Sequence, residues 1–460
     1  MNQSRRTFLK GIAATGVALT AAGQVSAGDG TRYIVVGSGE GAAKRIRDAG
    51  FSVERELGGN VLVVTADDRS ALESVSGVSE VVVDRKMTLD APKLEEKKET
   101  TTDEDLYPFQ WDKQVTDVPE AHETATGDGT RIAIIDTGVD VDHPDLAANV
   151  NEDEGKLFKY GEISDDATDV YGHGTHVAGI AAASDDGTTG VVGTAPDAEI
   201  VSLRVFYYDD IDDDGEKELT TTRADLFTAI DHAAEIGADA ANMSIGTPPI
   251  PPQDNAGGLK VGYQRVIQSA SRRGTLTVVS AGNSSANLQQ GGYFTLPNSV
   301  AGAMSVSATG PNDALVFYSN YGTNEVSVGA PGGGYETLKK TLCADWDGDG
   351  DGEAPIDEDG DGEEEWVDCE IPEWPYPTNL VLSSVPPELY DGKYYAYFAG
   401  TSMAAPQVTG TAALVRELAS DANPNEVEQA IEQGAEGTSG KSDPELGAGR
   451  LNANRALDSI

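Results

Sequence analysis

Residues 400–406, Gly400-Thr401-Ser402-Met403-Ala404-Ala405-Pro406, place one serine among small side chains directly before an apolar helical segment. Small neighbours allow another polypeptide to approach the Ser402 hydroxyl, and the N-terminal end of a helix stabilises negative charge. A lone serine at such a position is usually only an N-cap. Because a free hydroxyl is a poor nucleophile, a catalytic Ser402 also requires a base and a group that orients that base.

The upstream sequence contains residues suited to both tasks. Of the five histidines, His173 stands between glycines at the entry to an apolar helix. His176 follows about one turn later and is expected to be a packed structural histidine. Asp136 ends the apolar run 132–135, which predicts a buried parallel strand with a carboxylate at its C-terminal end, where open α/β sheets place their sites.

The segments 136–138 (Asp-Thr-Gly), 173–176 (His-Gly-Thr-His) and 400–404 (Gly-Thr-Ser-Met-Ala) resemble the three active-site motifs of subtilisin-like serine proteases, the subtilase family. Their order differs from that of chymotrypsin and of the α/β-hydrolases. The resemblance covers roughly residues 105–456. It implies an α/β fold with a doubly wound, mostly parallel sheet, which the alternation of expected strands and helices also favours.

The resemblance implies a serine endopeptidase that hydrolyses peptide bonds through an acyl-enzyme. Ser402 would be the nucleophile, His173 the general base and Asp136 the residue that orients His173. Asn283 stands where the family has an asparagine that donates its side-chain amide to the oxyanion. The backbone N–H of Ser402 is the expected second donor. Without the other motifs, the Gly-Asn pair at 282–283 would indicate only a turn.

The resemblance also implies a substrate cleft of small, uncharged residues. One stretch would pair with the substrate as an added strand, a second would form another wall, and a third would lie at the floor of the primary pocket. These are, in that order, Ser244, Ile245 and Gly246; Ser280, Ala281 and Gly282; and Gly292. The pocket is expected to accept large apolar or aromatic side chains with broad selectivity. Processing at basic residues is the alternative.

The charge balance is strongly acidic, with 78 acids against 32 bases and a net charge of −46. Nucleic-acid binding is therefore not expected, because phosphates require cations. A diffuse acidic surface is typical of proteins kept soluble in high salt, where screening suppresses self-repulsion. An ordinary acidic secreted protein is the alternative. Within the subtilase family the chain resembles the halolysins, which implies a twin-arginine signal and an inhibitory prodomain.

The first residues predict export. Residues 4–10 form a twin-arginine signature, residues 11–22 are apolar but too short to span a membrane, and residues 25–27 fit a cleavage site. We therefore expect a signal peptide over residues 1–27 and a secreted monomer without a membrane anchor, which acts on proteins and peptides.

Residues 28–104 predict a small α+β unit and a charged linker. The expected β-α-β-β-α-β order over residues 31–88 is ferredoxin-like. It resembles the prodomains of subtilases, which assist folding and inhibit the enzyme as an intramolecular partner; an independent regulatory domain is the alternative. The linker over residues 91–104 is a plausible cleavage zone for self-processing. Residues 105–460 then form the catalytic domain.

An acidic insert is expected over residues 335–395. Asp347, Asp349, Asp351 and Glu358 fall at positions one, three, five and twelve of a calcium-loop pattern with glycine at position six. A solvated acidic loop is the alternative. Cys343 and Cys369, the only cysteines, bracket this stretch, and export favours a disulfide between them over two free thiols.

A second calcium site is implied only by the resemblance. Gln110 and Asp145 match ligand positions of the family's tight calcium site, but the loop at residues 184–187 is one residue longer than usual. A different class of function, an acidic calcium-binding or surface protein on an inactive protease scaffold, is disfavoured by the intact Asp136, His173 and Ser402.

Overall fold

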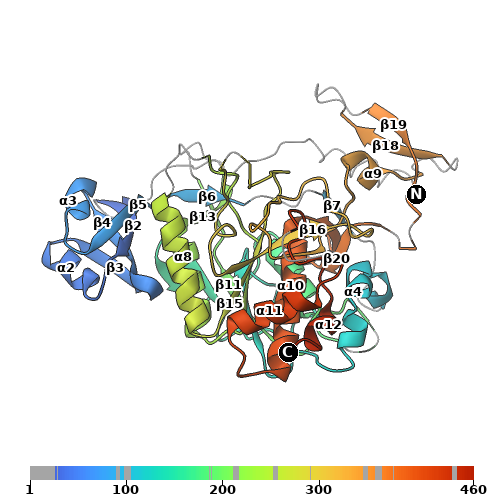
Figure 1. Ribbon diagram of the computed structural model, residues 1–460, viewed down its shortest axis with the longest axis horizontal. Helices are drawn as coiled ribbons and strands as arrows, with labels where there is room; N and C mark the ends of the chain where they lie inside the picture. Colours follow the sequence, from blue (N-terminus) through green and yellow to red (C-terminus); the bar gives the residue numbers. More distant parts are fainter. Residues whose placement is uncertain are drawn as a thin grey trace.

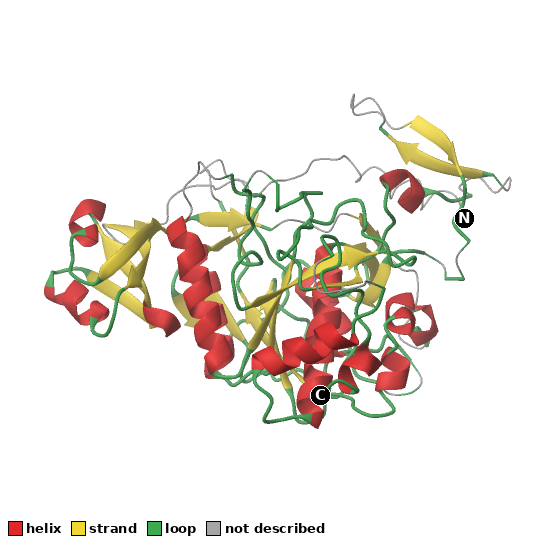
Figure 2. Ribbon diagram, in the orientation of Figure 1, coloured by secondary structure: helices red, strands yellow, loops and turns green. Residues whose placement is uncertain are grey.

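The computed structural model describes residues 26–27, 30–89, 94–97, 105–185, 187, 189–210, 217–251, 257–290, 292–345, 351–357, 365–373, 375–376, 378–437 and 443–460. Within these ranges the chain forms a small α+β unit and a large α/β unit (Figures 1 and 2). The small unit contains β1 Ser26–Ala27, β2 Gly30–Gly37, α2 Ala42–Asp48, β3 Ser52–Leu57, η2 Gly58–Asn60, β4 Val61–Ala66, α3 Arg69–Glu73 and β5 Val78–Val83.

The small unit has the predicted ferredoxin-like topology. Its strands lie in the order β3-β4-β2-β5, every pair is antiparallel, and β1 extends the edge beside β2. Successive side chains of β2 face opposite sides of the sheet. Tyr33 and Val35 pack in the core beneath α2 and α3, whereas Ile34 packs in a core shared with the large unit. Both faces of the small sheet are therefore covered.

The connecting segments form β6 Lys86–Thr88, β7 Leu94–Lys97 and η3 Tyr107–Phe109. The strands of the large unit are β8 Arg131–Asp136, β9 Lys156–Lys159, β10 Glu162–Ser164, β11 Glu199–Arg204, β12 Tyr207–Asp209, β13 Glu218–Thr222, β14 Ala240–Met243, β15 Leu276–Ser280, β16 Ala303–Thr309, β17 Val328–Pro331, β18 Gly352–Ile356, β19 Glu365–Cys369, β20 Val381–Ser384 and β21 Tyr395–Ala399. Its helices are α4 Trp111–Val115, α5 Val118–Ala121, α6 His173–Ala182, α7 Arg223–Glu235, α8 Gly257–Arg272, α9 Leu338–Leu342, α10 Thr401–Leu418, α11 Pro424–Gly434 and α12 Ala453–Leu457.

An eight-stranded sheet forms the centre of the large unit, in the order β10-β9-β11-β8-β14-β15-β16-β17. All of its pairs are parallel except β10 with β9. In β8, Ile132 and Ile134 face the core that contains α6 and α10, whereas Ala133 and Ile135 face the core that contains α7 and α8. The apolar run before Asp136 thus follows from burial on both faces, and the predicted doubly wound fold is confirmed.

The small unit packs against the α7–α8 side of the sheet, with α8 beside it (Figure 1). Asp84 accepts hydrogen bonds from Arg32 Nε (2.6 Å) and from the backbone N–H of Ala224 (3.0 Å), in the first turn of α7. Arg32 also donates to the Thr222 hydroxyl at 3.0 Å. A fully buried ion pair of the small unit therefore sits on the N-terminus of a helix of the large unit.

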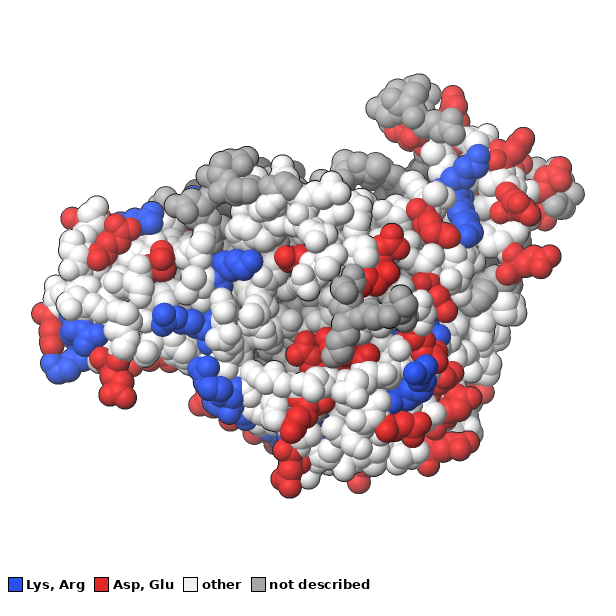
Figure 3. All heavy atoms as spheres, in the orientation of Figure 1, with Lys and Arg blue, Asp and Glu red and all other residues white. Residues whose placement is uncertain are grey.

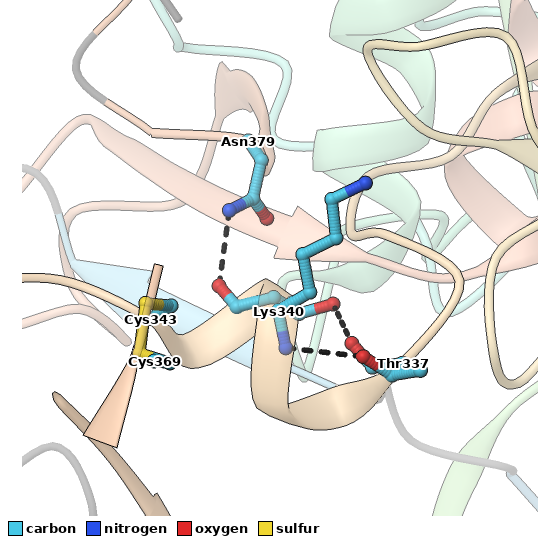
Figure 4. Close-up of a disulfide and its surroundings, with 6 residues drawn as sticks. Thr337, Lys340, Cys343, Cys369 and Asn379 are labelled. Atoms are coloured by element: carbon cyan, nitrogen blue, oxygen red, sulfur yellow. Dashed lines mark hydrogen bonds between the residues drawn. A yellow bond between two sulfur atoms is a disulfide. The ribbon is translucent and has the colours of Figure 1, made fainter. Parts of the chain in front are cut away.

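Acidic side chains are spread over the large unit on the face shown in Figure 3. The hairpin of β18 and β19 projects from the body (Figure 1), and a disulfide joins Cys343 to Cys369 at its base, just after α9 (Figure 4). Strand β20, which also lies within residues 335–395, does not project, because all four of its residues are buried in the large unit. Among the described helices, none has the length and apolar character needed to cross a membrane.

Candidate active site

Ser402 is the second residue of α10, and Gly400 rather than Ser402 occupies the N-cap position. The Ser402 side chain is almost buried, and its hydroxyl lies 3.4 Å from the carbonyl oxygen of Ser244. Ser244 in turn donates its hydroxyl to the Ser402 carbonyl at 2.8 Å. The first N–H groups of a helix have no intrahelical acceptor, so the backbone at Ser402 is available to an anion.

Asp136 and His173 form a buried pair. Asp136 ends β8, His173 begins α6, and His173 Nδ1 lies 2.7 Å from Asp136 Oδ1. The same carboxylate oxygen accepts the backbone N–H of Thr137 at 2.8 Å. A carboxylate at Nδ1 favours the tautomer that protonates this nitrogen, so Nε2 is the position at which a neutral His173 accepts a proton.

The sheet order explains why distant motifs meet. The strands β8, β14 and β15 are parallel neighbours, so their C-terminal ends lie along one edge. Asp136 ends the first, Ser244 follows the second, and Ser280 ends the third. Through its contacts with Ser244, Ser402 is held at this same edge, where open α/β sheets bind ligands.

Asn283 contacts the residue that precedes the serine. Its side-chain oxygen accepts both the backbone N–H of Thr401, at 2.9 Å, and the Thr401 hydroxyl, at 2.8 Å. The Thr401 hydroxyl also accepts the backbone N–H of Gly282 at 3.1 Å. Because the oxygen is engaged, the Nδ2 amide is directed away from Thr401, and it lies 3.6 Å from the position of a Cβ added to Gly400.

The residues expected to form the substrate cleft lie in three segments of the large unit. Ser244, Ile245 and Gly246 continue from the end of β14, and Ser280, Ala281 and Gly282 continue from the end of β15. Gly282 has a φ of 97°, a left-handed value that favours glycine. Gly292 lies two residues before Phe294, which pairs with Ile250 beyond the first stretch.

His176 is a structural histidine, as predicted. Its Nε2 lies 3.1 Å from the carbonyl oxygen of Ala396, and its ring stacks on Phe398 with centroids 4.1 Å apart. Burial lowers the pKa of His176 to about 3, so its imidazole is neutral in the folded protein at neutral pH. This leaves His173 as the histidine that faces a carboxylate at the strand edge.

Several polar residues of the site were not identified from the sequence. Thr409 donates to Asn242 Oδ1 at 3.0 Å, and Asn242 Nδ2 donates to the Ser244 hydroxyl at 3.0 Å. This chain of bonds ties α10 to β14 beneath the serine. The sequence signal that could have identified these residues is Asn242, an amide within an otherwise apolar strand, because a buried amide requires hydrogen-bond partners.

The side chains of Gln110 and Asp145 both contact the backbone of one loop. Gln110 Oε1 accepts the backbone N–H of Val192 at 2.7 Å, and Asp145 Oδ2 accepts that of Val191 at 3.0 Å. Side-chain oxygens beside a loop backbone are the donor type that calcium prefers. Residues 186 and 188 of this loop lie outside the described ranges, and within those ranges no group of three or more His, Cys, Asp or Glu side chains is arranged to hold a metal.

Only part of the predicted calcium loop in the acidic insert lies within the described residues. Asp347, Asp349 and Glu358 lie outside the described residues. Asp351 directly precedes the strand β18 and Asp357 directly follows it. An extended strand advances ~3.3 Å per residue, so these two residues lie ~20 Å apart. Asp351 and Asp357 therefore do not bind the same ion, because calcium ligands lie within ~2.6 Å of the ion.

Comparison with known proteins gives consistent matches. The profile of the Peptidase_S8 family, described as the subtilase family, matches residues 127–449. A thermophilic serine proteinase of Bacillus sp. (strain AK1) is 32% identical over 355 residues, which is 76% of this chain and 67% of the relative. Thermitase of Thermoactinomyces vulgaris is 30% identical over 353 residues, 76% of this chain and 95% of the relative.

Solved structures agree in fold. A protease of Pseudoalteromonas arctica matches with a TM-score of 0.57 and 26% identity, covering 78% of this chain and 99% of its own. Fervidolysin of Fervidobacterium pennivorans matches with a TM-score of 0.64 and 24% identity, covering 96% of this chain and 63% of its own. The second match reports on the fold alone.

Proposed function

The chain belongs to the subtilase family and is a serine-type endopeptidase, and from that premise we propose that Ser402, His173 and Asp136 are its catalytic triad. The observation that carries the proposal is the 2.7 Å contact between His173 Nδ1 and Asp136 Oδ1 at the sheet edge that also holds Ser402. A neutral His173 oriented in this way presents Nε2 as the proton acceptor.

In the proposed reaction, His173 Nε2 takes the Ser402 proton as Oγ attacks the carbonyl carbon of the scissile peptide. The resulting oxyanion is bound by Asn283 Nδ2 and the backbone N–H of Ser402. The C–N bond then breaks, the departing amine takes the proton from His173, and the acyl group remains on Ser402. Water, activated by the same histidine, hydrolyses this ester and restores the free serine.

We also propose that the cleft prefers a large apolar or aromatic residue before the scissile bond. The support is the absence of charge in the stretches 244–246 and 280–282, which leaves main-chain pairing as the main contact with substrate. The net charge of −46 and the twin-arginine signature support secretion into a high-salt environment.

We propose further that residues 28–104 act as an inhibitory prodomain and linker. Beyond the small unit, β6 pairs antiparallel with β13, and β7 pairs antiparallel with β21, the strand that leads to Gly400 and Ser402. In that pairing Leu94 stands opposite Ala399. A linker that occupies this edge would hinder substrate until it is cut, and calcium at the Gln110 and Asp145 loop would stabilise the mature enzyme.

A serine-reactive phosphonate tests the triad directly. The mature protein should be labelled on Ser402 and should lose hydrolysis of a peptide with phenylalanine or leucine before the scissile bond. An unlabelled protein that still binds calcium would support the alternative of an acidic surface protein on an inactive scaffold. A panel with lysine or arginine at the same position then measures the preference as a ratio of kcat/KM.

A further inference from the structure

Asp169 is a nearly buried carboxylate, 7% exposed, that lies outside the proposed triad. Five donors converge on it, at distances of 2.6–2.9 Å. Its Oδ1 accepts the Thr137 hydroxyl and the backbone N–H groups of Tyr171 and Gly172, and its Oδ2 accepts the backbone N–H and the hydroxyl of Thr175. Both oxygens of the Asp169 carboxylate are therefore engaged by donors from the surrounding chain.

These bonds connect the two chain segments that carry Asp136 and His173. Tyr171, Gly172 and Thr175 surround His173 in sequence, whereas Thr137 follows Asp136. The Thr137 hydroxyl donates to Asp169 and also accepts the backbone N–H of Gly174 at 2.8 Å. The backbone N–H of Thr137 donates to Asp136. Asp169 therefore holds the start of α6 against the end of β8.

The backbone at the start of α6 packs closely against the segment that follows β8, so the two segments fit together in only one way. A Cβ added to Gly138 would lie 2.5 Å from the carbonyl oxygen of Thr168, and one added to Gly174 would lie 2.1 Å from the carbonyl oxygen of Gly138. Both contacts are shorter than any that a side-chain carbon tolerates. With no space between the segments, the hydrogen bonds of Asp169 set where the His173 ring stands relative to Asp136.

We propose that Asp169 is a positioning residue, which acts through Thr137 and the first turn of α6 to align His173 with Asp136. This inference rests on the proposed role of His173 as the general base. Asp169→Asn replaces one acceptor oxygen by an NH₂ group that would face donors. A displacement of the base by ~1 Å lowers the reaction rate on the order of 100-fold, so we expect a 10- to 100-fold loss in kcat with KM changed less than about threefold.

The experiment compares Asp169→Asn with the parent and with Asp165→Asn. Asp165 lies four residues earlier in the same loop, is 89% exposed, and serves as the matched control. Active sites are titrated with the phosphonate, so that kcat refers to folded sites only. In Asp169→Asn, the rate constant of phosphonate inactivation should fall in parallel with kcat, while Asp165→Asn keeps parent values.

A second pair of variants makes the test independent of whether Asp169→Asn folds. Thr137→Val removes the bridging hydroxyl and should lower kcat per titrated site, whereas Thr137→Ser should restore it. A purely structural role would reduce the number of titratable sites or the melting temperature and leave kcat per site unchanged, and that result would overturn the proposal. A parent that the phosphonate does not label would instead contradict the proposed triad.

Discussion

Asn283 accepts two hydrogen bonds through one oxygen, from the backbone N–H and from the hydroxyl of Thr401, the residue directly before Ser402. The amide is thereby fixed in orientation before any substrate arrives. Preorganised donors are effective because they need no rearrangement when charge develops on the substrate. Thr401 thus links the proposed oxyanion donor to the proposed nucleophile through a single side chain.

Replacing Asn283 by alanine should lower kcat on the order of 100- to 1,000-fold with little change in KM, a range that is known for subtilisin, a member of this family. Thr401→Val should cause a smaller loss of kcat, because it removes one of the two hydrogen bonds that orient the Asn283 side chain and leaves the backbone bond, and Thr401→Ser is the matched control. Steady-state kinetics on a peptide substrate measure all three. A rise in KM without a fall in kcat would show that Asn283 only shapes the loop.

Ser402→Ala should lower peptidase activity by a factor on the order of 10⁶, as the equivalent change does in subtilisin. The same variant should accumulate as the uncut precursor, because self-processing needs the same serine. Gel analysis and N-terminal sequencing of the secreted protein check this. Normal processing of the secreted variant would contradict self-maturation and indicate that a second protease cuts the precursor.

The proposed triad residues and Asn283 could be predicted because each stands within a short contiguous motif. The strands and helices could be predicted for a similar reason, since burial on both faces leaves unbroken apolar runs such as 132–135. Strand β14 shows where this reasoning ends. The sequence of residues 239–245 indicates one strand that ends at Ile245, but the ladder ends at Met243, and Ser244 directs its hydroxyl and carbonyl groups to Ser402.

The role of Asp169 and the hairpin in the acidic insert could not be predicted from the sequence. Asp169 is one of 78 acids, and its role depends on Thr137, which is 32 positions away in the chain. In the insert, alternating Asp and Gly match a calcium loop by composition, whereas residues 352–356 pair as a strand with residues 365–369. Cross-strand pairing of this kind leaves no local signal in a sequence rich in acids.

The buried His176 should make stability depend on pH. Its pKa is lowered by burial from 6.5 to about 3, so between these values the unfolded chain binds a proton that the folded protein does not. Stability should therefore fall as the pH drops through this window, by up to about 1.4 kcal/mol for each pH unit. Thermal unfolding of the Ser402→Ala precursor from pH 7.5 to pH 4 measures the slope. His176→Gln should reduce it, and an unchanged slope would assign the acid sensitivity to other groups.

Removal of calcium should show which of the two candidate sites, the loop at Gln110 and Asp145 or the acidic insert, binds the ion. A bound ion stabilises the folded protein in proportion to the logarithm of its free concentration over its Kd, so a chelator should lower the melting temperature of the Ser402→Ala precursor. The strand β18 separates Asp351 from Asp357 by ~20 Å, whereas Gln110 and Asp145 contact consecutive loop residues, so we expect the ion at Gln110 and Asp145. Asp145→Asn preserves the size of the side chain and should abolish the response to the chelator.

The matched variant, in which Asp347, Asp349 and Asp351 are replaced by asparagine, should respond as the parent does. The reverse pattern would place calcium in the hairpin, and a parent that does not respond to the chelator would remove calcium from the proposed function.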